Sequence, residues 1–557
     1  MSDATLDRAA VQAKAPDILR HVLMLSTVFA FVTITVLAFT RNVNWDEFYF
    51  LSHVHAYLDG RLDRPMQTVF VHGFTWLNRL PGNEMEEIVA ARLVMVGFVA
   101  LTAVSIYRIA RNLSAETPAL IATMAFLTSG FTLVYGGSFR ADPMAAALAT
   151  ASIALLMTTR LGLLSMLITA ILSALAVLVT VKTVLFAPAY LAALIWRMDE
   201  RGLPLRVLGS GILAVTFVAI LYSWHAAGIT PAPGADTVSN AREAVSTGLL
   251  GSGFFPRSKE ILTWVLLSLG ALPLILAGLR TARPARLKLV LILFSFPFLS
   301  VVIYRNAFPY FFPFAVPLLM VSVALGAQNL RGTLTFAVCV VLMVAGGLGQ
   351  GAFALRNGTS LQRATLAEVH RIFPEPIPYI GDSGMVARFP RVGFFMSGWG
   401  MQNYLAAGKP IFSELVAANH PPLLLANKSV LTYTMRAPET GEAPPILFPE
   451  DHVFLRQSYI HYSGPIYLAG GETLLTEDGG RLTLPFPGTY RVQTSTIISI
   501  DGQEVMDGDV IGFDHSELVI TGPVGSSVQL IWDTGVKPDP DALPRDSVYA
   551  PFWNLFK

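Results

Sequence analysis

The sequence has 557 residues, of which 53% are hydrophobic and 14% are charged, and its net charge at pH 7 is +1. Soluble domains carry about 25% charged residues, so this composition excludes an ordinary soluble protein and predicts a polytopic membrane protein. The near-neutral charge gives no indication of nucleic-acid binding, and the single cysteine, Cys339, excludes an intramolecular disulfide.

Apolar runs along the first two thirds of the chain predict about eleven membrane spans, several of them shorter than the usual ~20 residues. A polar segment, 1–21, precedes them and is expected to be a disordered or surface-lying cytoplasmic tail. The first run, 22–40, is too long for a signal-peptide core and lacks a small-residue cleavage site, so it predicts a retained span. The later runs are 93–107, 117–136, 143–159, 162–181, 183–196, 207–224, 260–279, 289–304, 307–326 and 332–352. The segment 161–196 could equally form one long bent element.

Basic residues at alternate span ends predict the orientation in the membrane. These groups are Arg108 with Arg111; Arg160; Arg197 with Arg201 and Arg206; Arg280 with Arg283, Arg286 and Lys288; and Arg331. The positive-inside rule places them in the cytoplasm, together with the N-terminus. The loop 41–92, the turn 136–140, the loop 225–259 and everything after 352 then lie outside. We therefore expect a multi-pass protein of the inner (cell) membrane whose C-terminal region is periplasmic or otherwise extracytoplasmic.

The chain changes character after the transmembrane domain, 22–354. Residues 355–447 mix helical and strand patterns, and residues 448–557 contain short strands with turn signals such as Asp501-Gly502. This pattern predicts an extracytoplasmic α/β region followed by a β-sandwich-like region. The last residues include apolar side chains that could contact the membrane interface or the sandwich, namely Phe552, Trp553, Leu555 and Phe556.

An acidic pair, Asp46-Glu47, follows the first span and opens a short helical pattern that ends before Gly60. Asn44 is suited to cap this helix, and Glu47, three residues later, can complete a capping box. Asp46 is left in the first turn, where the helix dipole favours an ionised carboxylate. A fixed carboxylate beside a membrane cavity is a candidate general base. The alternative is that both acids only cap the helix.

Further ionisable residues fall at the same outer ends of the predicted spans. Arg140 and Asp142 precede one span, Arg92 opens another, and Lys182 lies between two apolar runs. The outward turn 304–313 adds Arg305 and Tyr310, and the loop 225–259 adds Arg257. Charges this close to hydrocarbon are costly unless they face a cavity or a partner, so their co-location predicts a site for an anionic lipid phosphate and a hydroxyl. For each cation alone, ordinary snorkelling is an equally good explanation, and Asp142 before Pro143 could be a helix cap.

His53, His55 and His72 give only a weak metal signal, because helical positions i and i+2 face apart. The sequence contains no phosphate-binding P-loop, GxSxG or HExxH pattern, which gives serine-hydrolase and zinc-protease functions no support. No definite cofactor or metal site is predicted, and a divalent cation is left open.

The ordered motifs resemble those of GT-C glycosyltransferases that use polyprenyl-phosphate sugars, in particular the protein O-mannosyltransferase and lipid A aminoarabinose transferase branch. The resemblance covers roughly residues 20–352. Its motifs are Asp46-Glu47, Ala91-Arg92-Leu93, Arg140 with Asp142, Lys182, and Arg305 with Tyr310 and Pro313. It implies an inverting transfer outside the membrane with Asp46 as the acceptor base. It further implies that Arg92, Arg140, Lys182 and Arg305 bind the donor phosphate and that Asp142 orients the site.

The prediction is therefore an integral membrane glycosyltransferase that moves a sugar from a polyprenyl phosphate to an extracytoplasmic glycan, lipid or protein. Asp46, Glu47 and Asp142 are its candidate catalytic residues, and the loop 225–259 is expected to border the cavity. Two alternatives are a polytopic lipid or solute transporter and a non-catalytic envelope scaffold. A transporter would place its ionisable groups or Gly/Pro breaks near the bilayer midplane, whereas here they gather at the outer mouth.

Overall fold

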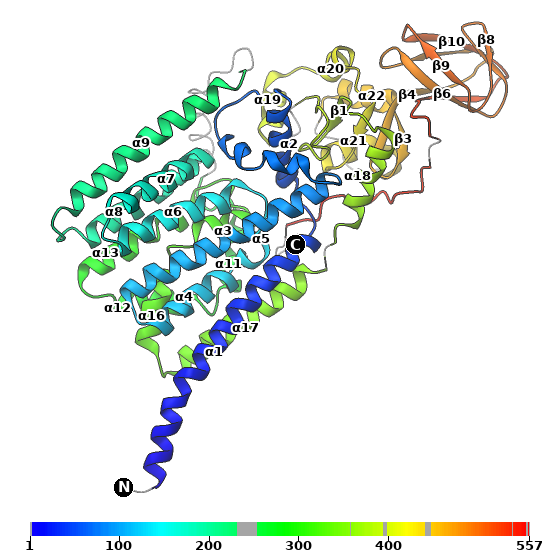
Figure 1. Cartoon of the computed structure of the whole chain (residues 1–557). Helices are drawn as coiled ribbons and strands as arrows, with labels where there is room; N and C mark the ends of the chain where they lie inside the picture. Colours follow the sequence, from blue (N-terminus) through cyan, green and yellow to red (C-terminus); the bar gives the residue numbers. More distant parts are fainter. Residues whose placement is uncertain are drawn as a thin grey trace.

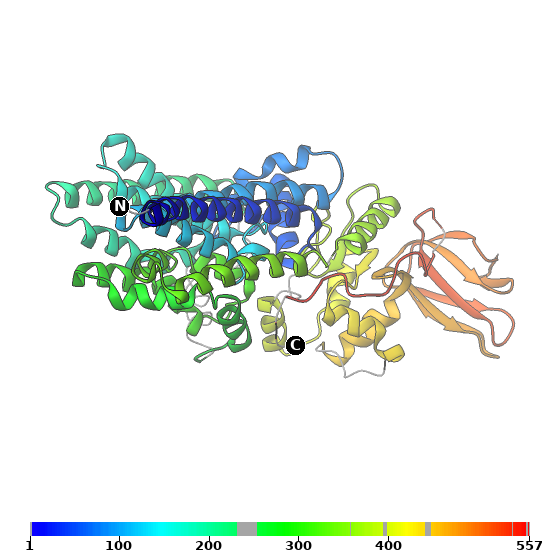
Figure 2. The same cartoon turned by 90° about the horizontal axis from the view of Figure 1, so that it is seen from below.

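The computed structural model describes residues 3–230, 253–356, 358–393, 398–440, 447–536, 539–552 and 555. The molecule is elongated, with a helical bundle at one end and strand-rich layers at the other (Figures 1 and 2). The N-terminus lies at the far end of the bundle, whereas the last described residues return to the junction between the two parts (Figure 1). Most of the predicted loop 225–259 lies outside the described residues.

Helices dominate the first 356 residues. They are α1 (Asp3–Thr40), α2 (Trp45–Leu58), α3 (Glu84–Leu113), α4 (Glu116–Thr128), α5 (Thr132–Tyr135), α6 (Ala141–Thr158), α7 (Leu163–Val179), α8 (Ala187–Trp196), α9 (Leu203–Ala227), α11 (Ser258–Leu267), α12 (Leu272–Thr281), α13 (Ala285–Phe294), α14 (Phe296–Leu299), α15 (Phe312–Ala315), α16 (Val321–Leu330) and α17 (Leu334–Ala354). Short 3₁₀ helices cover η1 (Val69–Gly73), η2 (Thr75–Arg79), η3 (Val181–Phe186), η4 (Ser300–Val302) and η5 (Pro309–Phe311).

Within the described residues, five helices are long and apolar enough to cross a membrane, namely α1 from Ile18, α3, α6, α9 and α17. Two further helix pairs qualify only when joined across bends of 87° (α11 with α12) and 43° (α13 with α14 and η4), which gives up to seven spans. The chain is therefore a multi-pass membrane protein, with fewer full-length spans than the eleven apolar runs predict. The difference arises because several runs fold as short or broken helices.

The run 117–136 shows why apolar length overestimates the span count. Helix α4 ends at Thr128, and Gly130 then adopts a left-handed φ of +64°. A Cβ at Gly130 would lie 2.2 Å from the buried indole of Trp264, so only glycine fits this close approach. Helix α1 is longer than its apolar run predicts. It begins at Asp3 and so includes the segment expected to be a disordered or surface-lying tail.

The basic span ends gather at one end of the bundle. Arg197 Nη1 donates to the carbonyl oxygens of Leu156 and Thr159 at the end of α6, and Arg206 Nη1 donates to the Arg160 carbonyl at 2.7 Å. Helix α6 begins at the opposite end with Asp142, so these cations lie one membrane-length helix away from the acidic site. The helices therefore bring these cations to one end of the bundle and the acidic site to the other.

The C-terminal part mixes helices with two sheets. Its helices are α18 (Ser360–Ile372), α19 (Gly398–Ala407), α20 (Phe412–Asn419), α21 (Ser429–Thr440) and α22 (Pro449–Ser458). Its strands are β1 (Tyr379–Gly381), β2 (Leu423–Leu425), β3 (Tyr459–Ser463), β4 (Ile466–Leu474), β5 (Gly480–Thr483), β6 (Gly488–Thr494), β7 (Ile498–Ile500), β8 (Gln503–Val505), β9 (Val510–Phe513), β10 (Glu517–Thr521) and β11 (Ser527–Trp532).

One sheet runs through both predicted C-terminal regions. Its order is β1-β2-β4-β11-β6-β9, with β3 also paired to β4, and a second sheet has the order β5-β10-β7-β8. The long strand β4 pairs with β2 through its first residues and with β11 through its last, so the boundary expected at 447/448 does not divide the sheet. Side chains such as Leu482, Val492, Ile498 and Leu530 form the core of the β-rich part.

Candidate active site

The helix that carries the acidic pair forms as predicted. Asn44 is the N-cap of α2, its side chain accepts from the Asp46 amide at 3.0 Å, and a capping box with Glu47 is present. Phe48, Leu51 and Val54 are buried on one face of the helix. The box fixes the start of α2, so the two carboxylates leave the same turn in different directions.

Glu47 is fully buried in a cluster of cations. Its Oε1 accepts from Arg92 at 2.7 Å, from Arg41 at 3.2 Å and from the Asn44 amide at 3.0 Å. Its Oε2 accepts from Arg92 Nε at 2.7 Å and from the Phe139 amide at 2.9 Å. Burial alone would raise the pKa of Glu47, but the charges of Arg92 and Arg41 outweigh it and lower the pKa to about 2. Glu47 therefore joins α1, α2, α3 and the 136–140 turn.

Arg92 does not lie where a donor-phosphate ligand is expected. Besides its two bonds to Glu47, its Nη1 donates to the carbonyls of Ala38 and Arg41, and its Nη2 donates to the carbonyl of Asn42. These contacts use all five donors of the guanidinium, and the side chain is 1% exposed. In this arrangement Arg92 has no donor left for the phosphate that the resemblance implies; it balances the charge of Glu47 and holds the end of α1.

Asp46 belongs to a second, more open cluster. Arg140 Nη1 donates to Asp46 Oδ2, and Arg140 Nη2 lies 3.5 Å from Asp142 Oδ2. Lys182 Nζ donates to the other oxygen of Asp142. The Asp46 side chain is 25% exposed and that of Lys182 is 21% exposed, whereas Asp142 is 1% exposed. The structure thus brings together Asp46, Arg140, Asp142 and Lys182, which the sequence predicts to converge.

The second cluster retains polar atoms that could bind a ligand. Asp142 Oδ2 and Arg140 Nε are buried and make no hydrogen bond within the described structure. Arg140, although buried, has its pKa raised above the ordinary value, because the neighbouring charges of Asp46 and Asp142 outweigh desolvation. The positive charge of Arg140 is therefore held firmly at the mouth of the bundle.

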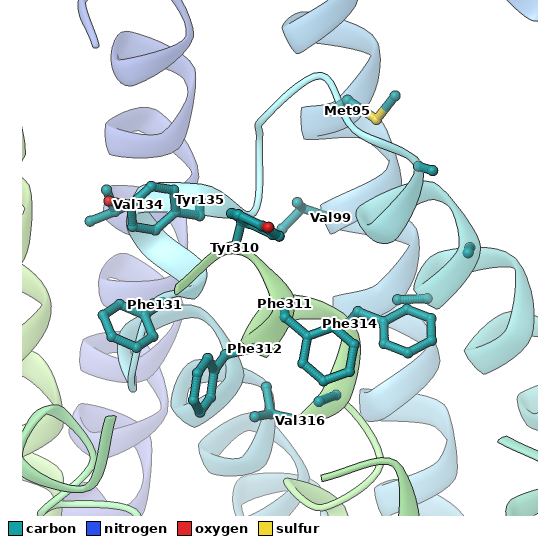
Figure 3. Packing of buried hydrophobic residues seen from close by; sticks show 14 of the residues in the cluster. Met95, Val99, Phe131, Val134, Tyr135, Tyr310, Phe311, Phe312, Phe314 and Val316 are labelled. Atoms are coloured by element: carbon teal, nitrogen blue, oxygen red, sulfur yellow. The ribbon is translucent and has the colours of Figure 1, made fainter. Parts of the chain in front are cut away.

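An aromatic layer lies beside Arg140. The Tyr310 ring stacks on the Arg140 guanidinium at 3.4 Å, and Tyr310 belongs to the segment that also carries Phe311 and Phe312. Figure 3 shows Tyr310 close to Tyr135 of α5, with Phe312 facing Phe131 below them. This layer fixes the orientation of Arg140 and separates the charged cluster from the bundle core.

Arg257 and Arg305 lie on the same side as the aromatic layer. Arg257 Nε donates to the Arg305 carbonyl at 3.0 Å, and the Arg257 guanidinium lies 3.8 Å from the Phe308 ring centre. With the Gln402 amide turned so that its oxygen faces Arg305, Arg305 donates to it at 2.6 and 2.8 Å. Gln402 lies on α19, so the C-terminal part contacts one of the predicted phosphate ligands.

The three histidines that gave the weak metal signal have different partners in the structure. His55 pairs with Glu87 at 2.6 Å, and His72 Nε2 contacts His225 Nδ1 at 2.9 Å. His53 packs against Tyr49 with its Nδ1 buried, and the desolvation lowers its pKa to about 3. Among the described residues, no group of three or more His, Cys, Asp or Glu side chains is arranged to hold a metal ion.

Two residues near the site, Arg41 and Lys428, were missed by sequence reasoning. Arg41 bonds Glu47 and, at 2.7 Å, Ser138; its position directly after the first span was the available signal. Lys428 lies 4.9 Å from the Trp45 ring centre and 3.3 Å from Asp382. No pattern in the sequence indicates that the C-terminal part would reach α2.

Among the comparisons with known proteins, only the comparison with solved structures gives matches. No family model matches the sequence, and no curated protein matches it. Among solved structures, ArnT from Cupriavidus metallidurans bound to undecaprenyl phosphate aligns with a TM-score of 0.50 and 16% identity, over 74% of this chain and 94% of that chain. The chain has the GT-C fold.

Other GT-C structures match at similar levels. The Archaeoglobus fulgidus oligosaccharyltransferase in its apo form aligns with a TM-score of 0.49 and 12% identity over 85% of this chain and 73% of that chain. The same archaeal enzyme, AglB, in complex with an inhibitory peptide and a dolichol-phosphate aligns with a TM-score of 0.49 and 13% identity over 83% and 74%. The alignment with ArnT confirms the GT-C fold predicted from the motifs, for a chain that also carries a C-terminal strand-rich region.

Proposed function

We propose that this protein is a membrane glycosyltransferase that moves a sugar from a polyprenyl-phosphate donor to an extracytoplasmic acceptor. The observation that carries the proposal is the Asp46–Arg140–Asp142–Lys182 cluster, which sets a partly exposed carboxylate beside two cations at one end of a GT-C bundle. The fold it shares with ArnT, solved with undecaprenyl phosphate, supports the choice of donor. The acceptor is a glycan, a lipid or a protein.

The proposed reaction needs three functions from the protein. A hydroxyl of the acceptor attacks the anomeric carbon, the bond from that carbon to the phosphate oxygen breaks, and its electron pair leaves with the phosphate. Asp46 accepts the hydroxyl proton, and attack opposite the leaving phosphate inverts the anomeric centre. Arg140 and Lys182 stabilise the charge that develops on the phosphate, and the bound geometry aligns the reactants.

The ion pair between Asp46 and Arg140 gives this reaction an order. While Arg140 donates to Asp46, an oxygen of the carboxylate is occupied by the guanidinium and is not available to an acceptor hydroxyl. A donor phosphate competes for the same guanidinium, because Arg binds phosphate through charge-assisted hydrogen bonds. Donor binding thus releases the Asp46 carboxylate for the acceptor hydroxyl. Asp142 holds Lys182 in place during this exchange.

The charge distribution also favours a site on the outer face. The basic residues at the opposite end of the bundle mark the cytoplasmic side by the positive-inside rule, which leaves Asp46 and the C-terminal part outside. A lipid-linked donor suits that location, because its phosphate is the energised leaving group and the membrane delivers it.

The experiment is donor consumption by the purified protein in lipid vesicles, with polyprenyl-phosphate-linked radiolabelled sugars and an envelope extract as the acceptor source. Wild type should consume the donor, and Asp46→Asn should slow it by about 10²–10⁴-fold. Asp59→Asn is the matched control, since Asp59 ends the same helix and pairs with Arg61 at the exposed surface. Full activity of Asp46→Asn, or use of a nucleotide sugar in place of the lipid donor, would refute the proposal.

A further inference from the structure

The C-terminal tail returns to the mouth of the bundle and is anchored there. Asn42, just after α1, donates through Nδ2 to the Val548 carbonyl at 3.3 Å and accepts through Oδ1 from the Ala550 amide at 3.0 Å. Tyr549 is buried, and its hydroxyl accepts from Asn427 Nδ2 at 3.2 Å. The tail is therefore a built part of the mouth, although it follows the strand-rich region in sequence.

Phe552 lies at the centre of an aromatic cluster formed by four other rings. These rings come from α2, α5 and the segment before α15: Trp45 (4.8 Å between ring centres), Tyr310 (5.4 Å), Phe308 (5.5 Å) and Tyr135 (6.0 Å). Two of them, Tyr135 and Tyr310, lie beside each other in the aromatic layer of Figure 3, and both contact Phe552. Three distant parts of the chain thus supply one apolar surface, and the tail completes it.

Each of those four rings also carries a cation. The pairs, with the distance from cation to ring centre, are Arg140 on Tyr310 (3.4 Å), Arg257 on Phe308 (3.8 Å), Lys428 on Trp45 (4.9 Å) and Arg41 on Tyr135 (5.0 Å). An apolar centre with a cationic rim suits an amphiphile whose apolar chain ends in an anionic group. Arg140 belongs to both this rim and the Asp46 cluster.

Two cavities lie along the seam of α1, α5 and α17, next to this cluster. The lining of the upper one includes Arg41, Val134, Tyr135, Phe353 and Phe552. The lower one is an apolar groove whose lining includes Ser26, Leu133, Gly347 and Leu348. Leu133 lines the lower cavity and Val134 the upper one, and Leu348 and Phe353 of α17 lie about one and a half turns apart, so the two cavities succeed one another along this seam and define a path.

We infer that this path is the binding site for the isoprenoid chain of a polyprenyl phosphate, and that Phe552 forms its wall at the phosphate end. The inference rests on the proposed function. The chain would lie in the apolar groove, pass Phe552, and place its phosphate beside Arg140. The C-terminal tail is then part of the donor site, and Phe552 is a substrate-binding residue that contacts the isoprene units next to the phosphate.

The test measures binding of farnesyl phosphate and undecaprenyl phosphate to the full-length protein in detergent micelles. Phe552→Ala should weaken both ligands about three- to ten-fold, because each loses the same aromatic contact near the phosphate. Leu555→Ala is the matched control in the same tail, since the Leu555 side chain is 49% exposed. Phe552→Leu, which keeps an apolar side chain, should recover part of the affinity.

A second variant tests the groove. Ser26→Trp fills the groove from α1 and should weaken the long ligand while leaving farnesyl phosphate nearly unchanged. Val28→Trp is its control, because Val28 is exposed on the same helix and does not line the groove.

The outcomes separate the two levels of the argument. If wild type binds neither polyprenyl phosphate, the proposed function fails. If wild type binds both and Phe552→Ala binds as well as Leu555→Ala, the tail is not part of the donor site. Tighter binding by Phe552→Ala would identify Phe552 as an obstruction and would also overturn the inference. If Ser26→Trp weakened farnesyl phosphate as much as undecaprenyl phosphate, the groove would not be the site of the distal isoprenoid chain.

Discussion

Two clusters of charge lie side by side at the mouth of this bundle, and they differ in how far they are closed. The cluster around Glu47 is sealed: its carboxylate is fully buried and receives five hydrogen bonds. The cluster around Asp46 is open, with exposed portions of Asp46 and Lys182 and buried polar atoms that make no hydrogen bond. Successive residues of a helix point about 100° apart, so two adjacent carboxylates can lie in different surroundings and have different roles.

The sealed cluster should act on stability. A buried ion pair adds little beyond its desolvation cost, but removing one partner strands the other charge. The open cluster should act on chemistry, because its charges are partly solvated and can exchange partners. Each of the following predictions separates these two consequences.

The largest expected effect is on folding. Arg92→Met should lower the free energy of unfolding by about 3–5 kcal/mol, because it leaves Glu47 buried without its principal cation. The measurement is thermal or denaturant unfolding of the purified protein in micelles. Arg79→Met, at an exposed position at the end of η2, should change it little. An unfolding free energy equal to wild type in Arg92→Met would show that the cluster does not hold the bundle together.

The next effect is on donor binding. Lys182→Met should weaken binding of a polyprenyl phosphate by about ten- to a hundred-fold, since one charge-assisted contact is lost. Arg140 still pairs with Asp142 in this variant, at 3.5 Å, so the melting temperature should fall less than in Arg92→Met. Lys259→Met, a cation at the start of α11, serves as the comparison. Unchanged donor affinity in Lys182→Met would remove this lysine from the proposed site.

Lowering the pH should reduce the stability that the sealed cluster contributes, because it protonates Glu47. The folded-state pKa of Glu47 is about 2, below its ordinary value, so its contribution to stability is fully present above about pH 4.5. That contribution should be lost progressively as pH falls from about 4.5 towards 2. In Glu47→Gln the pH dependence of unfolding should be flatter over this window than in wild type. Identical slopes would contradict the assignment of the low pKa to Glu47.

The smallest effect is expected for an exposed pair beside the sealed cluster. Arg363 of α18 pairs with Glu86 at the start of α3, and both side chains are about 40% exposed. Arg363→Ala should lower stability by less than about 1 kcal/mol, as for other solvated pairs. A loss comparable to that of Arg92→Met would mean that exposure does not separate structural from solvated charges in this protein.

Local patterns in the sequence were sufficient for part of this site. The capping box of Asn44 and Glu47 depends on three-residue spacing, and the convergence of Asp46, Arg140, Asp142 and Lys182 follows from their positions at alternate span ends. Both are properties of single segments or of topology. The fold class followed from the same ordered motifs.

Long-range pairing was beyond the reach of those patterns. The positions of the spans cannot reveal that Arg92 faces Glu47, because that depends on the rotation of α3 about its axis. They also cannot reveal that Phe552 contacts Trp45, because these two residues lie near opposite ends of the sequence. The span count was too high because close approaches such as Gly130 against Trp264 break apolar runs without making them less apolar.

The most direct measurement of the central comparison is single-turnover transfer of a labelled sugar by purified wild type, Asp46→Asn and Glu47→Gln, each with its melting temperature. Asp46→Asn should melt close to wild type and transfer about 10²–10⁴-fold more slowly, whereas Glu47→Gln should melt at a lower temperature and, while folded, transfer at a rate within about tenfold of wild type. A folded Glu47→Gln that is inactive beside a fully active Asp46→Asn would reverse the two assignments and contradict the account.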